Sequence, residues 1–455
     1  LTIENNAALR QVTDGGVNTG NIVVKRNATA MNRLDYTAWS SPVLGQQLQA
    51  FSPNTVATRF YQHLYTGTTT PTAYQSVTAT NNFVSGKGYM IRADNNYTAP
   101  TVFNGQFSGV PSNGVVSQSI GLGYNLIGNP YASPISANAF TRDNSSVKTL
   151  YFWTNTTAAS GGFYPQNNFA AYTSGAGGVA AYASAKIPNG TIQTGQGFYL
   201  EATSSATVNF NNAQRVNASV STQFYRNAET SDSIERNRIW LNLNDSNTSY
   251  NQILVGYIEG ATNGVDQGMD GKALDNSKPM IYNLLNDEAY VIQGKMLPFD
   301  VNDTVVLGLK VLTQGNYSIS LENVDGLFTS QDVFIKDNYT NIIHDIKQSE
   351  YSFSAQEGTY EDRFELVYRS GALSNEGFEF NGTLVIYSDT TGIQLNASEE
   401  IESIEVFDLL GRVLYQNSRI GQKLYTISNL QVTNHTLFVK VKLMSGQEIT
   451  KKIIH

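Results

Sequence analysis

The chain has 455 residues, of which 40% are hydrophobic, 11% aromatic and 15% charged, and its formal net charge is −8. It contains no cysteine, which excludes disulfide bonds, Cys-ligated metal centres and thiol nucleophiles. Many Tyr and Phe residues in a polar but weakly charged chain are typical of β-sheet proteins. We therefore predict an all-β fold built of tandem β-sandwich modules.

The charge is distributed unevenly along the chain. Residues 1–222 hold 11 basic and 6 acidic side chains, residues 223–380 hold 11 and 24, and residues 381–455 hold 7 of each. No dense basic stripe is available to replace phosphate counterions, so we expect no nucleic-acid partner. No run of about 18 apolar residues predicts a membrane-spanning helix.

The first residues, 1–29, are expected to be the last strands of a preceding β module. The chain starts at Leu1 without an initiator methionine. It also lacks the basic segment followed by an apolar segment that marks a signal peptide. Because an exported protein needs such a signal, we expect this chain to be the C-terminal part of a longer protein.

Residues 30–215 are predicted to be a β-sandwich region with an internal duplication. Tyr36–Pro42 matches Tyr124–Pro130 at an offset of 88 residues. Ser85–Ala93 matches Thr194–Ala202 at an offset of 109 residues. The second copy is therefore longer than the first.

The Gly- and Ala-rich residues 158–185 are expected to hold this extra length. Both copies also contain a Gly-x-Gly segment followed by an aromatic residue, at residues 86–89 and 195–198. A nucleotide-binding loop would need a helix after the glycines, but the residues that follow read as strands. The glycines are thus predicted to allow a bulge or a close backbone approach.

Residues 216–371 are predicted to form a second, acidic β-sandwich. Apolar residues alternate at Ile239, Leu241 and Leu243, as expected of a strand. Further apolar segments that read as strands are residues 252–258, 305–311, 317–321 and 364–368.

One loop of this segment is a candidate calcium site. Asp266, Asp270 and Asp275 lie in a stretch rich in glycine and oxygen-bearing side chains, the ligand type that calcium prefers. Their spacing is not that of an EF-hand, and the alternative is a plain polar loop.

Residues 372–382 are predicted to be a linker, and residues 383–455 a small immunoglobulin-like β-sandwich. Leu437, Val439, Val441 and Leu443 recur with the period of a strand that has one buried face. Residues 444–447 supply a turn with a glycine. About seven short strands are expected in this domain, including residues 383–387, 404–407, 413–415, 424–427 and 448–454.

This tail closely resembles the type A C-terminal sorting domain of the type IX secretion system, found on proteins exported across the outer membrane of Bacteroidetes. The resemblance is carried by residues 404–412, 424–430, 437–441 and 451–454. Where family members often have a Tyr-Pro-Asn-Pro-like stretch, this chain has residues 386–391. The resemblance implies a sorting signal made of Asp408, Leu409, Gly411, Arg412, Lys451, Lys452, Ile453, Ile454 and His455.

The upstream regions also resemble modules that precede this domain in large Bacteroidetes surface proteins. The matching segments are residues 39–43, 124–131, 195–198 and 251–257. The resemblance implies an extracellular, cell-surface protein of the adhesin or gliding-associated kind. Its expected partners are the type IX outer-membrane translocon, a shuttle barrel and a sortase-like protease that cleaves near residues 371–382 and attaches the protein to surface polysaccharide. The Asp-Ser/Thr-apolar pattern at Ser233, Thr304 and Thr390 resembles O-glycosylation sites of such proteins.

The sequence contains no pattern of catalytic residues. The histidines, at positions 63, 344, 435 and 455, form neither a nucleophile-elbow nor a His-Glu-x-x-His motif. Adjacent acidic pairs such as Glu361 and Asp362 do not by themselves supply the carboxyl spacing of a glycosidase. We therefore expect a non-enzymatic protein without cofactors. The alternatives are a carbohydrate-binding module that uses exposed Tyr and Trp rings, or an accessory region of a larger secreted hydrolase.

Overall fold

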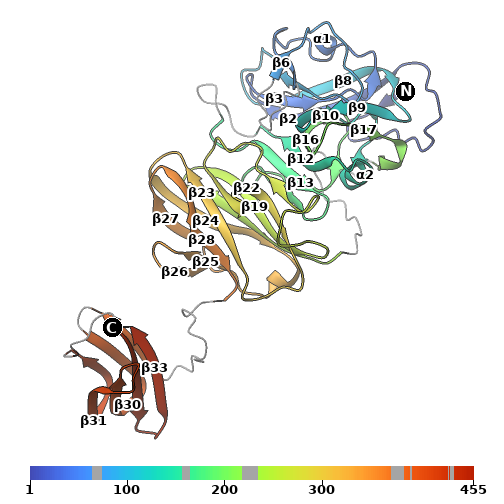
Figure 1. The fold of residues 1–455 in the computed structure, drawn as a ribbon. Helices are drawn as coiled ribbons and strands as arrows, with labels where there is room; N and C mark the ends of the chain where they lie inside the picture. Colours follow the sequence, from blue (N-terminus) through green and yellow to red (C-terminus); the bar gives the residue numbers. More distant parts are fainter. Residues whose placement is uncertain are drawn as a thin grey trace. The chain divides into compact units, whose positions relative to one another are not determined.

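The computed structural model describes residues 1–63, 74–155, 164–217, 234–369, 384–389, 392–428, 430 and 435–454. Strands dominate these residues, which confirms the all-β prediction (Figure 1). The chain divides into two compact units, a large unit of Leu1–Gly371 and a tail unit of Ala372–His455. The predicted linker, residues 372–382, lies outside the described residues. Within the described ranges, no helix is long and apolar enough to cross a membrane.

The large unit begins with the first copy of the duplication. One sheet has the order β3-β7-β5-β6 and another the order β1-β2-β8-β4. The strands of the first sheet are β3 (Tyr36–Trp39), β5 (Phe60–His63), β6 (Tyr74–Ser76) and β7 (Tyr89–Arg92). Those of the second are β1 (Thr2–Ile3), β2 (Ile22–Met31), β4 (Val43–Leu44) and β8 (Thr101–Pro111). Trp39 and Phe107 pack in the core with Phe51, the last residue of helix α1 (Leu48–Phe51).

The second copy repeats the first of these sheets with one additional strand. Its sheet has the order β10-β16-β12-β13-β14, and two short pairs, β9 with β17 and β11 with β15, lie outside it. The strands are β9 (Val116–Ile120), β10 (Gly123–Gly128), β11 (Ile135–Ser136), β12 (Val147–Trp153), β13 (Phe169–Thr173), β14 (Gly177–Val179), β15 (Thr191–Ile192), β16 (Gly197–Ala202) and β17 (Ala206–Phe210). Helix α2 (Ala137–Asp143) and the 3₁₀ turn η1 (Asn212–Gln214) complete the copy.

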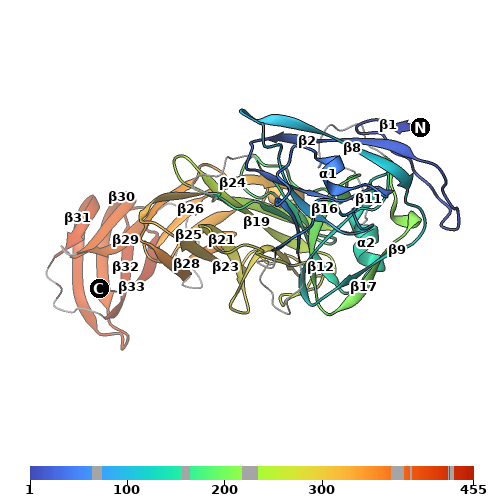
Figure 2. The same cartoon turned by 90° about the horizontal axis from the view of Figure 1, so that it is seen from above.

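Matching residues of the two copies occupy matching places in their sheets. Tyr36 lies opposite Arg92 in the β3–β7 pair, and Tyr124 lies opposite Glu201 in the β10–β16 pair. The offset of 88 residues relates Tyr36 to Tyr124, and the offset of 109 residues relates Arg92 to Glu201. Likewise β2 pairs with β8 as β9 pairs with β17 (Figure 2).

The assignment of residues 1–29 to a preceding module therefore needs correction. β2 pairs along most of its length with β8, a strand about eighty residues further on. Ile22, Val24 and Ala28 are buried in the same core as Trp39 and Phe107. Because β2 pairs with β8 and its apolar side chains lie in this core, β2 belongs to the first copy.

The two copies meet through reciprocal backbone hydrogen bonds. The Ser40 amide donates to the Gly195 carbonyl at 2.9 Å, and the Gly128 amide donates to the Gly86 carbonyl at 3.0 Å. Ser40 corresponds to Gly128 and Gly86 to Gly195 under the two offsets. An exchanged pair of contacts of this kind is the geometry of an approximate two-fold axis.

This contact explains the Gly-x-Gly segments. A Cβ at Gly88 would lie 2.5 Å from the Ile127 carbonyl oxygen, and one at Gly197 would lie 3.0 Å from the Ala38 carbonyl carbon. Each glycine thus leaves room for the backbone of the other copy. The structure agrees with the predicted close backbone approach and shows no helix after either segment.

The rest of the large unit is one sheet of 11 strands, the middle sheet, in the order β26-β25-β28-β23-β21-β22-β19-β18-β24-β27, with β20 paired to β22. Its strands are β18 (Arg236–Asn244), β19 (Ser249–Ile258), β20 (Gly271–Lys272), β21 (Met280–Leu285), β22 (Glu288–Lys295), β23 (Thr304–Val311), β24 (Gly315–Val324), β25 (Phe334–Asp337), β26 (Ile342–Asp345), β27 (Tyr351–Ala355) and β28 (Gly358–Val367). The turn η2 (Gly326–Thr329) follows β24.

The two ends of the middle sheet meet through side chains. Arg363 on β28 donates to Asp337 on β25 at 2.9 Å and to the Ser354 carbonyl of β27 at 3.0 Å. Tyr351 of β27 donates its hydroxyl to the same Asp337 carboxylate at 2.9 Å. The side chains of Arg363 and Asp337 are 7% and 0% exposed. This buried ion pair therefore links β25 and β28, at one end of the strand order, to β27 at the other.

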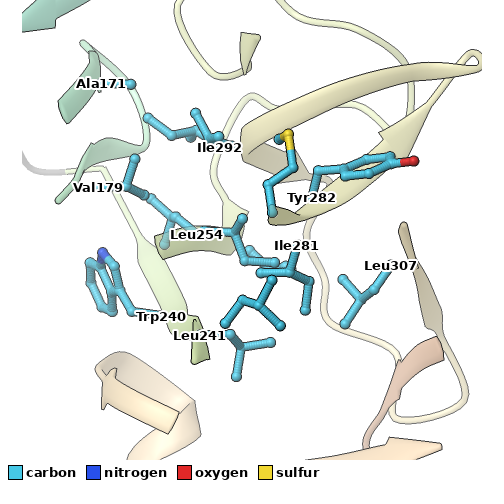
Figure 3. Packing of buried hydrophobic residues seen from close by; sticks show 14 of the residues in the cluster. Ala171, Val179, Trp240, Leu241, Leu254, Ile281, Tyr282, Ile292 and Leu307 are labelled. Atoms are coloured by element: carbon cyan, nitrogen blue, oxygen red, sulfur yellow. The ribbon is translucent and has the colours of Figure 1, made fainter. Parts of the chain in front are cut away.

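Each copy of the duplication has a core of its own, and part of the duplication also packs into the hydrophobic core of the middle sheet. Figure 3 shows Ala171 and Val179, from the second copy, next to Leu254, Ile292 and Trp240 of the middle sheet. The regions predicted as residues 30–215 and 216–371 are therefore joined by a shared apolar contact. Because Trp240 is buried as well as its neighbour Leu241, both faces of β18 are covered.

The additional strand of the second copy makes much of this contact. β14 has no counterpart in the first copy, and it lies within residues 158–185, where the insertion was expected. The Trp240 indole donates to the Gly178 carbonyl at 2.9 Å, and Gln252 accepts from the Ala180 amide at 2.9 Å. Arg238 donates to the Ala176 carbonyl at 3.0 Å. The inserted residues thus fix the duplication to the middle sheet.

The tail unit is a five-stranded sheet with its own core. Its strands are β29 (Leu384–Asp389), β30 (Gly392–Phe407), β31 (Val413–Ile427), β32 (Thr436–Leu443) and β33 (Glu448–Ile454). All three neighbouring strands pair with β30. β29 pairs with its first part, β32 pairs with its second part, and β31 pairs with both parts of β30. The side chains that fill the core include Ile404, Val406, Val439 and Val441.

The predicted count of seven short strands is wrong for the tail unit. Residues 413–415 and 424–427 are the two ends of a single strand, β31, and residues 404–407 are the end of β30. The residues between Tyr415 and Leu424 are mostly polar. In the described part of the tail unit β31 pairs only with β30, and such an edge strand tolerates polar side chains on its exposed side.

Candidate functional site

The large unit contains a cleft of about 960 Å³ between the duplication and the middle sheet. One wall comes from the two copies of the duplication, and the other comes from the middle sheet and its loops. No binding site at this position was predicted from the sequence. Its lining residues lie between positions 36 and 361 of the chain, so no local pattern brings them together.

The wall formed by the duplication is aromatic. It consists of Tyr36, Tyr61, Tyr74, Tyr124, Trp153, Tyr164 and Phe169. The rings of Tyr36 and Tyr61 are 5.9 Å apart between centroids, and those of Trp153 and Tyr164 are 5.6 Å apart. The Trp153 indole donates to the Tyr36 carbonyl at 2.8 Å, which connects the second copy to the first along this wall.

The opposite wall is polar and acidic. It includes Lys272, Asp275, Asn276, Ser277, Tyr282, Asp287, Glu288, Lys310, Thr359 and Glu361. Lys272 forms an ion pair with Glu288 at 2.7 Å, and Lys310 donates to the Asn276 carbonyl at 2.8 Å. Both lysines therefore already have a hydrogen-bond or ion-pair partner. The carboxylates of this wall outnumber the lysines.

Glu201 lies in the cleft on the aromatic side. It is on β16 opposite Tyr124, and only 7% of its surface is exposed. Burial raises the pKa of Glu201 and nearby Glu288 raises it further, against the opposing charges of Lys148 and Lys272. A hydrogen bond with Tyr151 also lowers the pKa, whereas the buried Oε2 atom accepts no hydrogen bond in the described part of the chain. Among the described residues with such an atom, Glu201 is the one that lines the cleft.

The adjacent acidic residues Glu361 and Asp362 point to different partners. Glu361 lines the cleft and accepts from the Tyr282 hydroxyl at 3.1 Å, whereas Asp362 accepts from the Tyr339 hydroxyl at 2.9 Å. Successive residues of a strand face opposite sides, so these two carboxyls do not form a catalytic pair.

The calcium candidates do not converge on one point. Asp270 is buried and accepts from the amides of Asp266 and Gly294, while Asp275 lies in the lining of the cleft. Burial raises the pKa of Asp270 to about 6. Among the described residues, no group of three His, Cys, Asp or Glu side chains is placed to hold a metal ion. The carboxylates of Asp266 and Asp270 instead hold this loop in its shape.

In the tail unit, the predicted sorting residues 408–412 form the turn between β30 and β31. The Asp408 carboxylate accepts from the amides of Leu410 and Arg412, both at 2.9 Å, and from the Arg412 guanidinium. Gly411 has a φ of +77°, the left-handed conformation expected in a three-residue hairpin loop. Leu409 and Leu410 are 67% and 80% exposed. The turn thus presents two leucines to solvent on a fixed backbone.

The other predicted sorting residues belong to the last strand, β33. Lys451 donates to the Leu384 carbonyl of β29 at 2.7 Å, and Lys452 is exposed. Ile453 packs against the core of the tail unit. Ile454 is the last residue of β33, and His455 lies outside the described residues. The structure therefore places residues 408–412 in a turn and residues 451–454 on a separate strand.

The remaining candidates are scattered. Thr304 is exposed at the start of β23, whereas Ser233 and Thr390 lie outside the described residues. Of the three tryptophans, Trp39 and Trp240 are buried and Trp153 lines the cleft. The tyrosines at or near the starts of the duplication's strands were the available sequence signal for the cleft. The sequence alone did not distinguish them from core residues.

Comparison with known families divides the chain near the same point as the structure. The profile of a domain of unknown function, DUF8694, matches residues 373–455. No curated protein matches the chain. The profile of a second domain of unknown function, DUF8693, matches residues 1–368. Since this match covers most of the sequence, the chain belongs to the DUF8693 family.

Proposed function

We propose that this chain is a non-enzymatic segment of a cell-surface protein, adhesin-like or gliding-associated, exported by the type IX secretion system. In this proposal the tail unit is the export and attachment signal. It would be recognised by the outer-membrane translocon and shuttle barrel, and removed by the sortase-like protease. The family match of the tail is to a domain of unknown function, so the proposal rests on the tail residues themselves.

The separate core of the tail unit supports this proposal. Its apolar side chains are buried among themselves, so the unit can be recognised without disturbing the large unit. The turn of residues 408–412 offers Leu409 and Leu410 to a receptor. Exposed apolar side chains that cluster on a rigid turn are typical of protein contact sites.

A reporter experiment tests the export proposal. Residues 372–455 are fused after a signal peptide to a fluorescent protein and expressed with and without the type IX translocon. We expect translocon-dependent fluorescence outside the cell. The variant Leu409→Ser/Leu410→Ser should reduce export, whereas the control Met444→Ser, at an exposed position of another hairpin, should not. Retention in the periplasm of both strains would refute the proposal.

The cleft favours a second function, carbohydrate binding by the large unit. One aromatic wall faces one wall rich in hydrogen-bonding groups. Sugar rings present apolar C–H faces and polar hydroxyl edges, so they match both walls. The wider alternative, an accessory region of a larger secreted hydrolase, is compatible with such binding and has no separate support in the cleft.

A glycan array tests the second function. The purified chain, residues 1–455, is labelled and applied to an array of plant, microbial and host glycans. Saturable binding that falls when Tyr61 is replaced by Ala would support carbohydrate binding in the cleft. No binding to any glycan would leave the large unit with a spacer role.

A further inference from the structure

We propose that the cleft selects uncharged oligosaccharides over anionic ones, with the aromatic wall stacking against the sugar rings and Glu201 bonding a sugar hydroxyl. This inference rests on the proposed carbohydrate binding and adds the class of ligand. It follows from the size of the cleft, the difference between its walls, its charge and the buried carboxyl.

The size of the cleft suits an oligomer. Small-molecule sites usually have volumes of about 300–1,000 Å³, and this cleft, at about 960 Å³, is near the upper limit. The rings of Tyr36 and Tyr61 lie 5.9 Å apart, and Trp153 and Tyr164 form another close pair. Several stacking surfaces along one wall fit several sugar rings better than a single one.

The rings are positioned for stacking. Tyr36, Tyr61, Trp153 and Tyr164 are half-buried, and Tyr74 is 41% exposed. Several polar groups of this wall already have partners: the Tyr61 hydroxyl accepts from Arg59 at 2.8 Å, and the Trp153 indole donates to Tyr36. The planes of Tyr36 and Tyr61 are inclined by 59° and those of Trp153 and Tyr164 by 79°, so the rings of a pair do not form one flat platform. A sugar that stacks on a single ring gains contact area without further hydrogen bonds.

The charge of the cleft discriminates against anions. Among the described residues, its lining has the carboxyls of Glu201, Asp275, Asp287, Glu288 and Glu361 but the amines of only Lys272 and Lys310. Lys272 is paired with Glu288, and Lys310 is bonded to a backbone carbonyl. Arg59, which bonds the Tyr61 hydroxyl, is a cation beside the aromatic wall. A uronate or sulfate group on the acidic wall would meet mostly like charges, and such repulsion is an effective way to reject a competing ligand.

Glu201 gives the cleft a specific hydrogen-bonding requirement. Its Oε2 atom is buried and receives no donor from the described residues. An unsatisfied buried acceptor destabilises the site until a donor arrives. A sugar hydroxyl can supply that donor, and a site built to bond a hydroxyl strongly rejects an analogue that lacks it.

The same groups favour a saccharide over a proline-rich peptide, which also binds aromatic grooves. An ionised carboxylate only accepts hydrogen bonds, whereas a hydroxyl both donates and accepts. The carbonyls of a peptide need donors, and the two lysines of the cleft are already engaged. Hydroxyl groups can satisfy the acidic wall in a way that peptide carbonyls cannot.

Calorimetric titration of the full chain tests this inference. The probes are tetrasaccharides of glucose, mannose, xylose and N-acetylglucosamine, tetragalacturonate as the anion, and a decaproline peptide. We expect at least one neutral tetrasaccharide to bind at least tenfold more tightly than tetragalacturonate. Tyr61→Ala should weaken neutral binding about tenfold, equivalent to about 1.4 kcal/mol. Tyr339→Ala, at an exposed ring outside the cleft, should leave binding unchanged.

A second variant tests selectivity separately from stacking. Asp287→Asn/Glu361→Gln removes two negative charges and keeps the side-chain shapes, and asparagine tolerates the positive φ of residue 287. We expect this variant to bind tetragalacturonate at least fivefold more tightly and the neutral sugar unchanged. Equal or preferential binding of tetragalacturonate by the unmodified chain would overturn the inference while leaving carbohydrate binding intact. If no sugar binds, or only decaproline binds, the carbohydrate function itself fails.

Discussion

The duplication and the middle sheet bring their strands together by different physical means. The two copies of the duplication meet where glycines let one backbone approach another, as at Gly88 and Gly197. The middle sheet brings its ends together with a buried ion pair, Arg363 and Asp337. The glycine contact depends on the absence of side chains. The ion pair depends on two buried charged side chains, each of which compensates the charge of the other.

This difference determines how each region should respond to mutation. At a glycine contact, an added methyl group must displace a backbone, and overpacking of this kind typically costs about 1–3 kcal/mol. At a buried ion pair, removal of one partner leaves the other charge uncompensated. We therefore expect the middle sheet to be more sensitive to a single substitution than the contact between the copies.

The largest expected effect is that of Arg363→Met. The Asp337 carboxylate would remain buried with a hydroxyl and an amide as its donors, and we expect the free energy of unfolding of residues 1–371 to fall by about 3–5 kcal/mol. Urea denaturation followed by tryptophan fluorescence measures this change. The double variant Arg363→Met/Asp337→Leu should recover at least half of the loss, because no isolated charge remains. A double variant no more stable than the single one would contradict this explanation.

Substitution of the contact glycines should have the next largest effect. Gly88→Ala places a Cβ 2.5 Å from a carbonyl oxygen, and we expect a loss of about 1–3 kcal/mol in the same denaturation experiment. Gly197→Ala meets its nearest atom at 3.0 Å, so its loss should be smaller. The control is Gly15→Ala, where nothing lies within 4 Å, and its stability should change by less than about 0.5 kcal/mol.

A smaller effect is the pH dependence of stability, which should again differ between the middle sheet and the contact between the two copies. Burial alone would raise the pKa of Asp337, but hydrogen bonds from Arg363, the Tyr339 amide and Tyr351 outweigh it and lower the pKa. Because the pKa of an unfolded aspartate is about 3.9, this group stabilises the folded state above about pH 4. Its contribution is lost as the pH falls below that value and the carboxylate is protonated.

Denaturation curves between neutral pH and about pH 3 measure this dependence. The unmodified chain should lose stability more steeply below about pH 4 than Arg363→Met/Asp337→Leu, which lacks the titrating group. Identical slopes would show that Asp337 does not contribute to acid sensitivity. Gly88→Ala changes no charge, so its slope should match that of the unmodified chain.

The fold was predictable where a physical pattern repeats within the sequence. The all-β class followed from composition, and the paired offsets between Tyr36 and Tyr124 and between Gly88 and Gly197 located the two copies. The packing of segments that are far apart in the sequence was not predictable. The side chains of Val179 and Leu254 look like the cores of two sandwiches in the sequence, and only the structure shows that they share one core.

The cleft was less predictable than the fold. Trp153 and Glu201 belong to strands whose sequences read as ordinary buried β structure, and the acidic wall comes from strands and loops far along the chain. In contrast, Asp408 and Gly411, which the resemblance named as sorting residues, lie together in one local hairpin turn. A turn is specified by consecutive residues, whereas a cleft is specified by how separate sheets pack.

The smallest expected effect is that of calcium on the middle region. The Asp270 carboxylate accepts from the amides of Gly294 and Asp266, and the Asp266 carboxylate accepts from Thr262. These oxygens are already used, and a ligand stabilises a protein only by binding the folded state. We expect calcium at about 1 mM, enough to fill an extracellular-type site, to change the Tm of the chain by less than about 1 °C relative to EDTA. A rise of several degrees that Asp270→Asn abolishes would instead show that the loop gives up its backbone bonds to hold a metal ion.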